Sequence, residues 1–299
     1  MAVMKAPNWR LISSGMPIGS LASGRISLGR LSRTFTASSG CQSNASRSKQ
    51  AMPTAPLAVD GQRSTPLSDA FSLKGKVTVV TGGGQGIGLS LARGAAELGS
   101  DVAVLDLSEN PKDEYAELEK TEGSYAEWSS ITSAGIVADK SFFETTWEEA
   151  SKILNVNLLG TYFTAQLAAK RMKAQSSGGS IVLIASISAH AALPSQNLSI
   201  YGSSKGAVKT LARHLAVELG PIGIRVNSVS PGAIETELTR NLAVTNPELM
   251  SRFRASTPLG RVGQREDLKG IVGYLMSDAA AYTTGTDILV TGGMHAGHL

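Results

Sequence analysis

Tyr201 and Lys205 carry the clearest chemistry in the sequence, because they stand four residues apart in a segment typical of a helix. Side chains at positions i and i+4 are neighbours on one helix face, which would bring a phenol beside an ammonium group. A free phenol has a pKa of about 10, and an adjacent cation lowers that pKa. The pair could therefore exchange a proton with a substrate oxygen, while Lys205 also reaches a ribose.

A glycine-rich loop is the second motif, placed between an apolar strand segment at 77–80 and a helix that starts near Gly88. The loop contains Gly82, Gln85, Gly86, Ile87 and Gly88. Without β-carbons the backbone can approach a phosphate closely, and the first turn of the following helix offers N–H donors. This strand–loop–helix arrangement predicts a site for a dinucleotide pyrophosphate.

Asp106 ends the next strand segment, about 20 residues beyond the loop. A carboxylate there can accept hydrogen bonds from the adenosine ribose hydroxyls, and it would repel a 2′-phosphate. Gln85 and Leu107 supply no basic side chain for such a phosphate. We therefore expect NAD to be favoured over NADP.

These strings together resemble the short-chain dehydrogenase/reductase family over about residues 71–299. The resemblance rests on the glycine loop, Ala134-Gly135, Asn157, Ser186, Tyr201-x-x-x-Lys205 and Pro231-Gly232. It implies a catalytic tetrad of Asn157, Ser186, Tyr201 and Lys205. Asn157 would hold a water linked to Lys205, Ser186 would hydrogen-bond the substrate oxygen, and Tyr201 would be the acid/base.

The same resemblance implies the remaining cofactor contacts. They would involve Ala134, Gly135, Tyr201, Lys205, Pro231, Ile234 and Thr236, the last two at the nicotinamide carboxamide. Segments 185–190 and 277–285 are similar to the polyol branch of the family, which includes mannitol dehydrogenases, sorbose reductases and arabinitol dehydrogenases. His190 would then line a polar substrate pocket, unless it is an ordinary loop histidine.

The elements that must position these residues alternate between strand and helix, which predicts an α/β fold: a Rossmann-type doubly wound parallel sheet. One interval is too short for that fold. Only 27 residues separate Asp106 from Ala134, where two strands and two helices need on the order of 40. The third strand and part of the fourth are therefore expected to be missing, with Ile131–Ser133 as a remnant. Either residues 123–133 supply a makeshift strand, or a block has been lost by splicing or in the gene model.

Residues 1–59 differ in composition from the rest of the chain. They hold seven basic residues, eleven serines and no acidic residue, which is typical of a mitochondrial transit peptide. We expect a disordered leader over 1–59, a matrix location and a dehydrogenase domain over 60–299. The alternative is a merely disordered extension of a cytoplasmic protein.

Charge and cysteine content exclude several classes. Outside the leader, 21 basic residues face 24 acidic ones, so the net charge is no argument for a nucleic-acid partner. The lone cysteine, Cys41, allows neither an intrachain disulfide nor a cysteine-based zinc site, and we expect no metal. No apolar run of about 18 residues exists, so we expect no membrane span.

These observations predict an oxidoreductase that transfers a hydride between NAD(P) and a secondary alcohol or ketone, with a small polyol or ketose as substrate. A 3-oxoacyl thioester reductase is the nearest enzymatic alternative. A catalytically silent family member, damaged between Asp106 and Ala134, is an alternative of another class. The resemblance also implies a homodimer or homotetramer.

Overall fold

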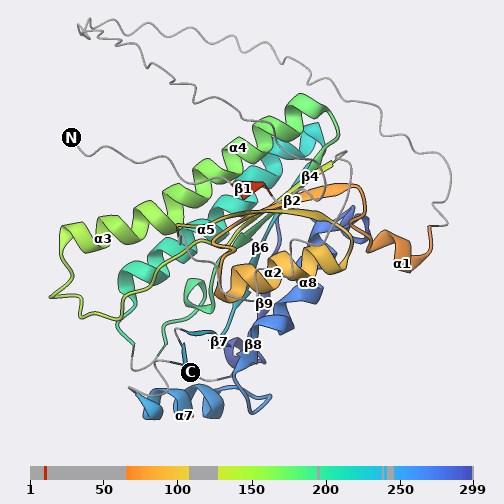
Figure 1. The fold of residues 1–299 in the computed structure, drawn as a ribbon. Helices are drawn as coiled ribbons and strands as arrows, with labels where there is room; N and C mark the ends of the chain where they lie inside the picture. The colour runs from red at the N-terminus through yellow and green to blue at the C-terminus, as the bar shows by residue number, and fades with distance from the viewer. Residues whose placement is uncertain are drawn as a thin grey trace, which may run out of the picture. The chain divides into compact units, whose positions relative to one another are not determined.

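The fold is a parallel sheet with helices on both faces (Figure 1). The computed structural model describes residues 10–11, 65–107, 127–193, 196–237, 239–240 and 246–297. Within these residues a seven-stranded sheet has the order β1-β3-β2-β4-β5-β6-β9. All of its neighbouring strands pair in parallel except β1 and β3. The Rossmann-type α/β architecture predicted from the sequence is confirmed.

The strands bring the chain back repeatedly to one edge, where the residues with chemistry follow the strand ends. The sheet consists of β1 (Arg10–Leu11), β2 (Lys76–Thr81), β3 (Asp101–Leu105), β4 (Glu127–Thr132), β5 (Gly179–Ile184), β6 (Ile224–Pro231) and β9 (Asp287–Val290). A separate parallel pair is formed by β7 (Ile234–Glu235) and β8 (Gly263–Gln264). In such sheets ligands bind beyond the carboxyl ends of the strands.

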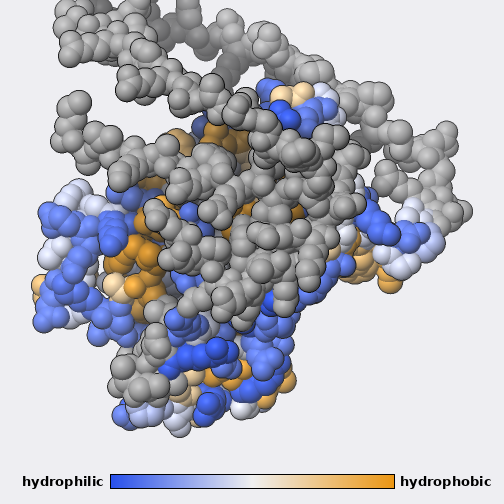
Figure 2. Space-filling model, viewed as in Figure 1, coloured by the Kyte–Doolittle hydropathy of each residue, from blue (hydrophilic) through white to orange (hydrophobic). Residues whose placement is uncertain are grey.

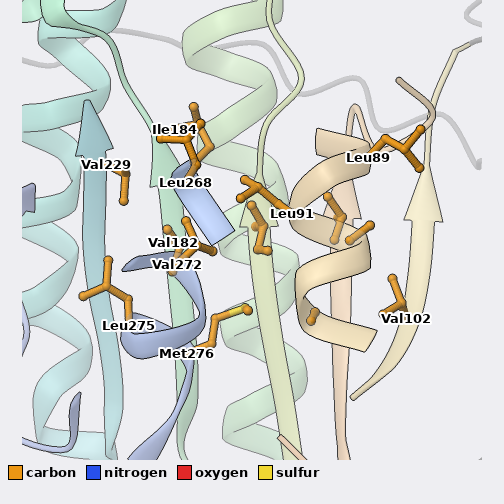
Figure 3. Close-up of a cluster of buried hydrophobic side chains, with 14 of the residues drawn as sticks. Leu89, Leu91, Val102, Val182, Ile184, Val229, Leu268, Val272, Leu275 and Met276 are labelled. Atoms are coloured by element: carbon orange, nitrogen blue, oxygen red, sulfur yellow. The ribbon is translucent and has the colours of Figure 1, made fainter. Parts of the chain in front are cut away.

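The helices form two layers, and each layer buries its own core. One cluster joins α2 (Gly86–Glu97) and α8 (Lys269–Met276) to the sheet, and its leucines, valines and Met276 interlock there (Figure 3). The other joins α4 (Gly160–Gln175) and α5 (Ser199–Leu219) to the opposite face. Further α-helices among the described residues are α1 (Leu67–Ala70), α3 (Trp147–Leu154) and α7 (Pro247–Ser256).

Strand β4 is longer than the remnant expected at Ile131–Ser133, since it begins at Glu127 and ends at Thr132. It pairs along its whole length with β2 and through its last four residues with β5. The makeshift strand considered from the sequence is therefore present in the structure. The segment lacks the apolar pattern of a buried strand, so the sequence did not predict it clearly. Backbone pairing on both sides can hold even a polar segment in a sheet.

The sequence of β4 fits its central position poorly. Ser129, Ser130 and Thr132 are buried, whereas strands buried on both faces are usually apolar throughout. The hydroxyls of Ser130 and Thr132 and the indole nitrogen of Trp128 have no hydrogen-bond partner among the described residues. Each such buried polar group costs about 1–3 kcal/mol. The strand completes the sheet at a cost in stability.

The family's third strand is expected at the edge beyond β3. In this structure β1, which belongs to the predicted leader, pairs with β3 there. Arg10 pairs with Val104, and Leu11 pairs with Ala103, in antiparallel register. This short pairing was not foreseen from the sequence. No parallel third strand occurs in the described ranges, and both 108–126 and the rest of the leader lie outside them.

On the face shown in Figure 2, the coloured residues are largely hydrophilic, with hydrophobic patches between them. Several large apolar side chains contribute to exposed surface, among them Tyr162, Phe163 and Leu167 on α4. Among the helices that the structure describes, none is long and apolar enough to span a bilayer.

Candidate active site

The glycine loop has the geometry of a phosphate cradle. Gly82 and Gly86 have φ angles of 68° and 57°, in the left-handed region that favours glycine. A β-carbon at Gly88 would overlap the carbonyl oxygen of Gly82, and one at Gly82 would lie 2.7 Å from the Cα of Ala134. Gln85, the N-cap of α2, makes no capping hydrogen bond through its side chain. The close packing and the open helix end fit a dinucleotide pyrophosphate.

Two further residues lie close to this loop. The Gly84 backbone N–H donates to Oδ2 of Asp106 at 2.9 Å, which ties the end of β3 to the loop. The methyl group of Thr236 lies 4.0 Å from the place that a β-carbon on Gly86 would take. The side chain of Ile87 packs against the core cluster. Asp106 and Thr236 thus lie beside the loop, and contact of Asp106, Thr236 and Ile87 with a cofactor stays a prediction.

Lys205 is buried on the inner face of α5, with 5% of its surface exposed. Its Nζ donates to the carbonyl oxygen of Ile184, the last residue of β5, at 2.8 Å. The same Nζ lies 6.0 Å from the centroid of the Tyr201 ring. Burial disfavours the charged ammonium and lowers the pKa of Lys205 to about 8.

Tyr201 forms a side-chain hydrogen bond with Ser186, which follows β5. Burial raises the pKa of the Tyr201 phenol above its ordinary value, and the bond to Ser186 acts in the opposite direction. The expectation that the pKa of Tyr201 lies below its ordinary value is thus wrong for this structure, because desolvation dominates. Near neutral pH the phenol is protonated and can donate.

Asn157 lies in a π-helical turn, Asn155–Leu159, between α3 and α4. Its Oδ1 accepts from the Ile136 N–H at 2.8 Å, and its Nδ2 donates to the Ile136 carbonyl at 2.9 Å and to Ser204 Oγ at 3.0 Å. Such turns re-aim side chains and are frequent at functional sites. The turn directs Asn157 inward, against the loop after β4 and the helix that carries Tyr201.

Gly135 is where these groups converge. A β-carbon on it would lie 3.3 Å from Lys205 Nζ and 3.4 Å from Asn157 Oδ1. The structure therefore brings Asn157 and Lys205 together at Gly135, and Ser186 together with Tyr201. The individual roles assigned to these four residues from the sequence, including the water at Asn157, stay predictions.

The remaining predicted contacts lie at the end of β6. Pro231 is its last residue, and Ile234 is buried in β7, where it pairs with Gly263. The backbone N–H of Thr236 donates to Thr239 Oγ1 at 2.7 Å. Contact of Ile234 and Thr236 with a nicotinamide stays a prediction.

A cleft of about 440 Å³ opens beside the start of α5. Its lining consists of Phe142, Ser188, Ala191, Ala192, Leu193, Gln196, Asn197, Leu198, Ser199, Gly202 and Ser203. The N–H of Asn197, one of these residues, donates to Asp139 Oδ1 at 2.7 Å. Phe142, Gln196 and Asn197 carry no recognisable motif, so sequence reasoning missed them. His190 is not among the lining residues, and its ring bonds Asp287 instead.

The described residues contain no group of three side chains suited to holding a metal ion. The side chains that the structure gathers near Gly135 and Ser186 are a phenol, a hydroxyl, an ammonium and an amide.

Comparison with known proteins now defines the class. A family model described as enoyl-(acyl carrier protein) reductase matches residues 129–295, and one described as short chain dehydrogenase matches residues 76–131. The chain belongs to the short-chain dehydrogenase/reductase family. The resemblance read from the sequence is confirmed.

Particular relatives narrow this to the polyol branch. The chain is 38% identical over 256 residues to a sorbose reductase of Schizosaccharomyces pombe, with 76% of this chain and 98% of the relative covered. It is 35% identical over 257 residues to an NADP-dependent mannitol dehydrogenase of Hypocrea jecorina, covering 76% and 95%. Among solved structures, a short-chain type dehydrogenase/reductase from Mycobacterium marinum is 35% identical with a TM-score of 0.71, covering 76% of this chain and 98% of that one.

Proposed function

We propose that this protein transfers a hydride between NAD(P) and a secondary alcohol or ketone of the polyol and ketose class, with Tyr201 as the acid/base. The observation that carries the proposal is the hydrogen bond between Tyr201 and Ser186, whose near neighbours in the chain, Gly202 and Ser188, line an uncharged cleft. Ser188, Ser199 and Ser203 line that cleft beside the start of α5. The relatives named as a sorbose reductase and a mannitol dehydrogenase support the substrate class.

The proton chemistry follows from the positions of the side chains. When bound, the nicotinamide gives or takes the hydride. In the direction of reduction, Tyr201 donates its phenolic proton to the substrate oxygen while the Ser186 hydroxyl hydrogen-bonds the same oxygen. Lys205, when charged, stabilises the phenolate that remains. Since burial raises the pKa of Tyr201, reduction is favoured near neutral pH and oxidation at alkaline pH.

The cleft suits a neutral, hydroxylated substrate. Its volume falls in the range of small-molecule sites, about 300–1,000 Å³. Its polar lining consists of serine hydroxyls and the amides of Gln196 and Asn197, with no charged side chain among the lining residues. Hydroxyls and amides both donate and accept, as a polyol chain requires.

We further propose that NAD is preferred over NADP, although the mannitol dehydrogenase relatives are named as NADP-dependent. Support comes from the Asp106 carboxylate, which is held against the loop by the Gly84 N–H and would repel a 2′-phosphate. Asp106→Asn keeps an acceptor for Gly84 and removes the charge. We expect this variant to gain affinity for NADPH relative to NADH. An unchanged ratio would show that Asp106 does not select the cofactor.

The presence of β4, which pairs with both of its neighbours, supports an active enzyme over a silent one. A lost block remains our account of the short interval. The sorbose reductase alignment spans 256 positions against 76% of 299 residues, about 227, so about 29 positions of the relative lack a counterpart here. Reading a transcript across residues 120–132 tests this, since an extra in-frame block is expected there.

Activity is tested by titrating the purified protein with NADH and NADPH, followed by nicotinamide fluorescence, and then by assaying ketoses and polyols. We expect saturable binding and reduction of sorbose or fructose. Binding without turnover of any ketose, but with turnover of a 3-oxoacyl thioester, would favour the thioester alternative. Absence of saturable binding would favour the silent alternative.

We also propose that the leader directs the protein to the mitochondrial matrix, based on its basic, serine-rich composition. Residues 1–59 fused to a fluorescent protein should accumulate in mitochondria, and replacement of Arg25, Arg30 and Arg33 by glutamine should abolish this. A diffuse cytoplasmic signal from the unaltered fusion would refute the address.

A homodimer or homotetramer is proposed from the exposed apolar side chains of α4. Tyr162, Phe163 and Leu167 are 41%, 54% and 60% exposed, which is costly for a lone subunit. Light scattering on the purified protein should give a mass of two or four chains. Phe163→Asp should shift that mass towards one chain, and a monomeric parent protein would contradict the proposal.

A further inference from the structure

A second polar cluster lies behind the site and takes no part in the chemistry described above. His190, which ends the short 3₁₀ turn Ile187–Ala189, places Nε2 2.7 Å from Oδ2 of Asp287 and 3.3 Å from Ser230 Oγ. Because both contacts use the same ring nitrogen, the cluster is not a relay from a serine through histidine to an acid. Its geometry instead resembles an anchor.

The fixed end of this anchor is Asp287, the first residue of β9. Its side chain is 4% exposed. It accepts hydrogen bonds from Ser228 Oγ at 2.5 Å and from Ser230 Oγ at 2.9 Å, both on β6. Asp287 also pairs with Ser228 in the sheet register. The carboxylate is therefore held between β9 and its neighbour β6. A buried carboxylate retains its place only with such donors.

The other end of the anchor is the turn that carries Ser186. Ser186 is the N-cap of this turn and His190 is its C-cap, and Ser186 Oγ accepts from the Ser188 N–H at 3.1 Å. A second tie comes from α5, where Lys209 Nζ donates to the Ala189 carbonyl at 3.0 Å. A displacement of His190 would therefore move the turn and Ser186 with it.

We propose that His190 is a positioning residue, which acts with Asp287 to hold the Ile187–Ala189 turn so that Ser186 stays in hydrogen-bond reach of Tyr201. The proposal rests on the proposed function, because it assigns Ser186 to the substrate oxygen. It also accounts for the position of His190 outside the cleft lining, one residue before Ala191, which does line it. His190 thus shapes the cleft without touching what the cleft holds.

The test compares three variants of the full-length protein. His190→Ala removes the anchor, His190→Gln retains an amide donor, and His214→Ala alters an exposed histidine on α5 as a control. We expect His190→Ala to lower kcat for ketose reduction by up to about 100-fold, the scale for a slight misplacement, with unchanged NAD(P)H affinity. His190→Gln should recover most of the rate, and His214→Ala should match the parent.

Coupling to Ser186 separates positioning from general stability. If His190 acts through Ser186, then adding His190→Ala to Ser186→Ala causes little further loss, because the effects of coupled residues are not additive. Full additivity would overturn the proposal, as would parent-like kcat in His190→Ala.

A second readout does not depend on catalysis. The N–H groups of Ser188 and His190 are hydrogen-bonded within the turn, to Ser186 Oγ and the Ile187 carbonyl. Hydrogen exchange of these amides should accelerate in His190→Ala and not in His214→Ala. Unchanged exchange in His190→Ala would refute the anchor, even if the parent protein reduced no ketose. If exchange is accelerated in His190→Ala but the parent protein reduces no ketose, only the proposed function is refuted.

Discussion

Replacing Lys205 by methionine should remove activity and at the same time stabilise the fold. Lys205 is 5% exposed, and its ammonium donates a hydrogen bond to the Ile184 carbonyl. A pKa of about 8 instead of the ordinary 10.5 corresponds to about 3 kcal/mol of unfavourable free energy for the buried charge near neutral pH. Methionine has a similar length and no charge. Allowing about 1 kcal/mol for the carbonyl that loses its donor, the free energy of unfolding should rise by about 2 kcal/mol at pH 7.

The stability gained by Lys205→Met should depend on pH. The pKa of Lys205 in the folded state lies below that in the unfolded chain, so the unfolded chain binds more protons between pH 8 and pH 10.5. The stability of the parent protein therefore rises with pH in that window, and the advantage of Lys205→Met shrinks. Urea unfolding at pH 7 and at higher pH measures this, with Lys170→Met on the exposed face of α4 as the control. A variant less stable than the parent at pH 7, or a pH-independent difference, would refute the reasoning.

Two further predictions concern the sheet and the loop. Thr132→Val removes a buried hydroxyl that has no partner among the described residues, so the free energy of unfolding should rise by about 1 kcal/mol. Thr78→Val breaks a 2.8 Å hydrogen bond to Ser100 and should lower the free energy of unfolding. Urea unfolding measures both variants, and equal shifts in their midpoints would contradict this account of β4. Gly88→Ala places a β-carbon against the Gly82 carbonyl, so fluorescence titration should show NAD(P)H binding largely lost, whereas parent-like affinity would refute the cradle.

Much of the site could be read from the sequence because its residues follow strand ends or share a helix face. Glycines at 82, 86 and 88 and the Tyr201–Lys205 pair keep fixed spacings, so local rules place them. The position of Asn157 could not be predicted from spacing alone. It lies within a long helical pattern, and only the π-helical turn explains why its side chain faces Lys205.

Other features depend on contacts between distant segments and leave no local signal. Strand β4 is built from a polar segment that no periodicity marks, and only its pairing with β2 and β5 makes it a strand. The raised pKa of Tyr201 likewise reflects burial, which spacing alone does not reveal. The bond between His190 and Asp287 joins residues 97 positions apart.

The central claim is that the Tyr201 hydroxyl moves the substrate proton, and Tyr201→Phe tests it most directly. Phenylalanine keeps the ring against Lys205 and removes only the hydroxyl that bonds Ser186. With NAD(P)H binding verified by fluorescence, the account predicts that ketose reduction falls by at least about 100-fold, the usual contribution of a general acid. Undiminished reduction by this variant would contradict the assignment of Tyr201.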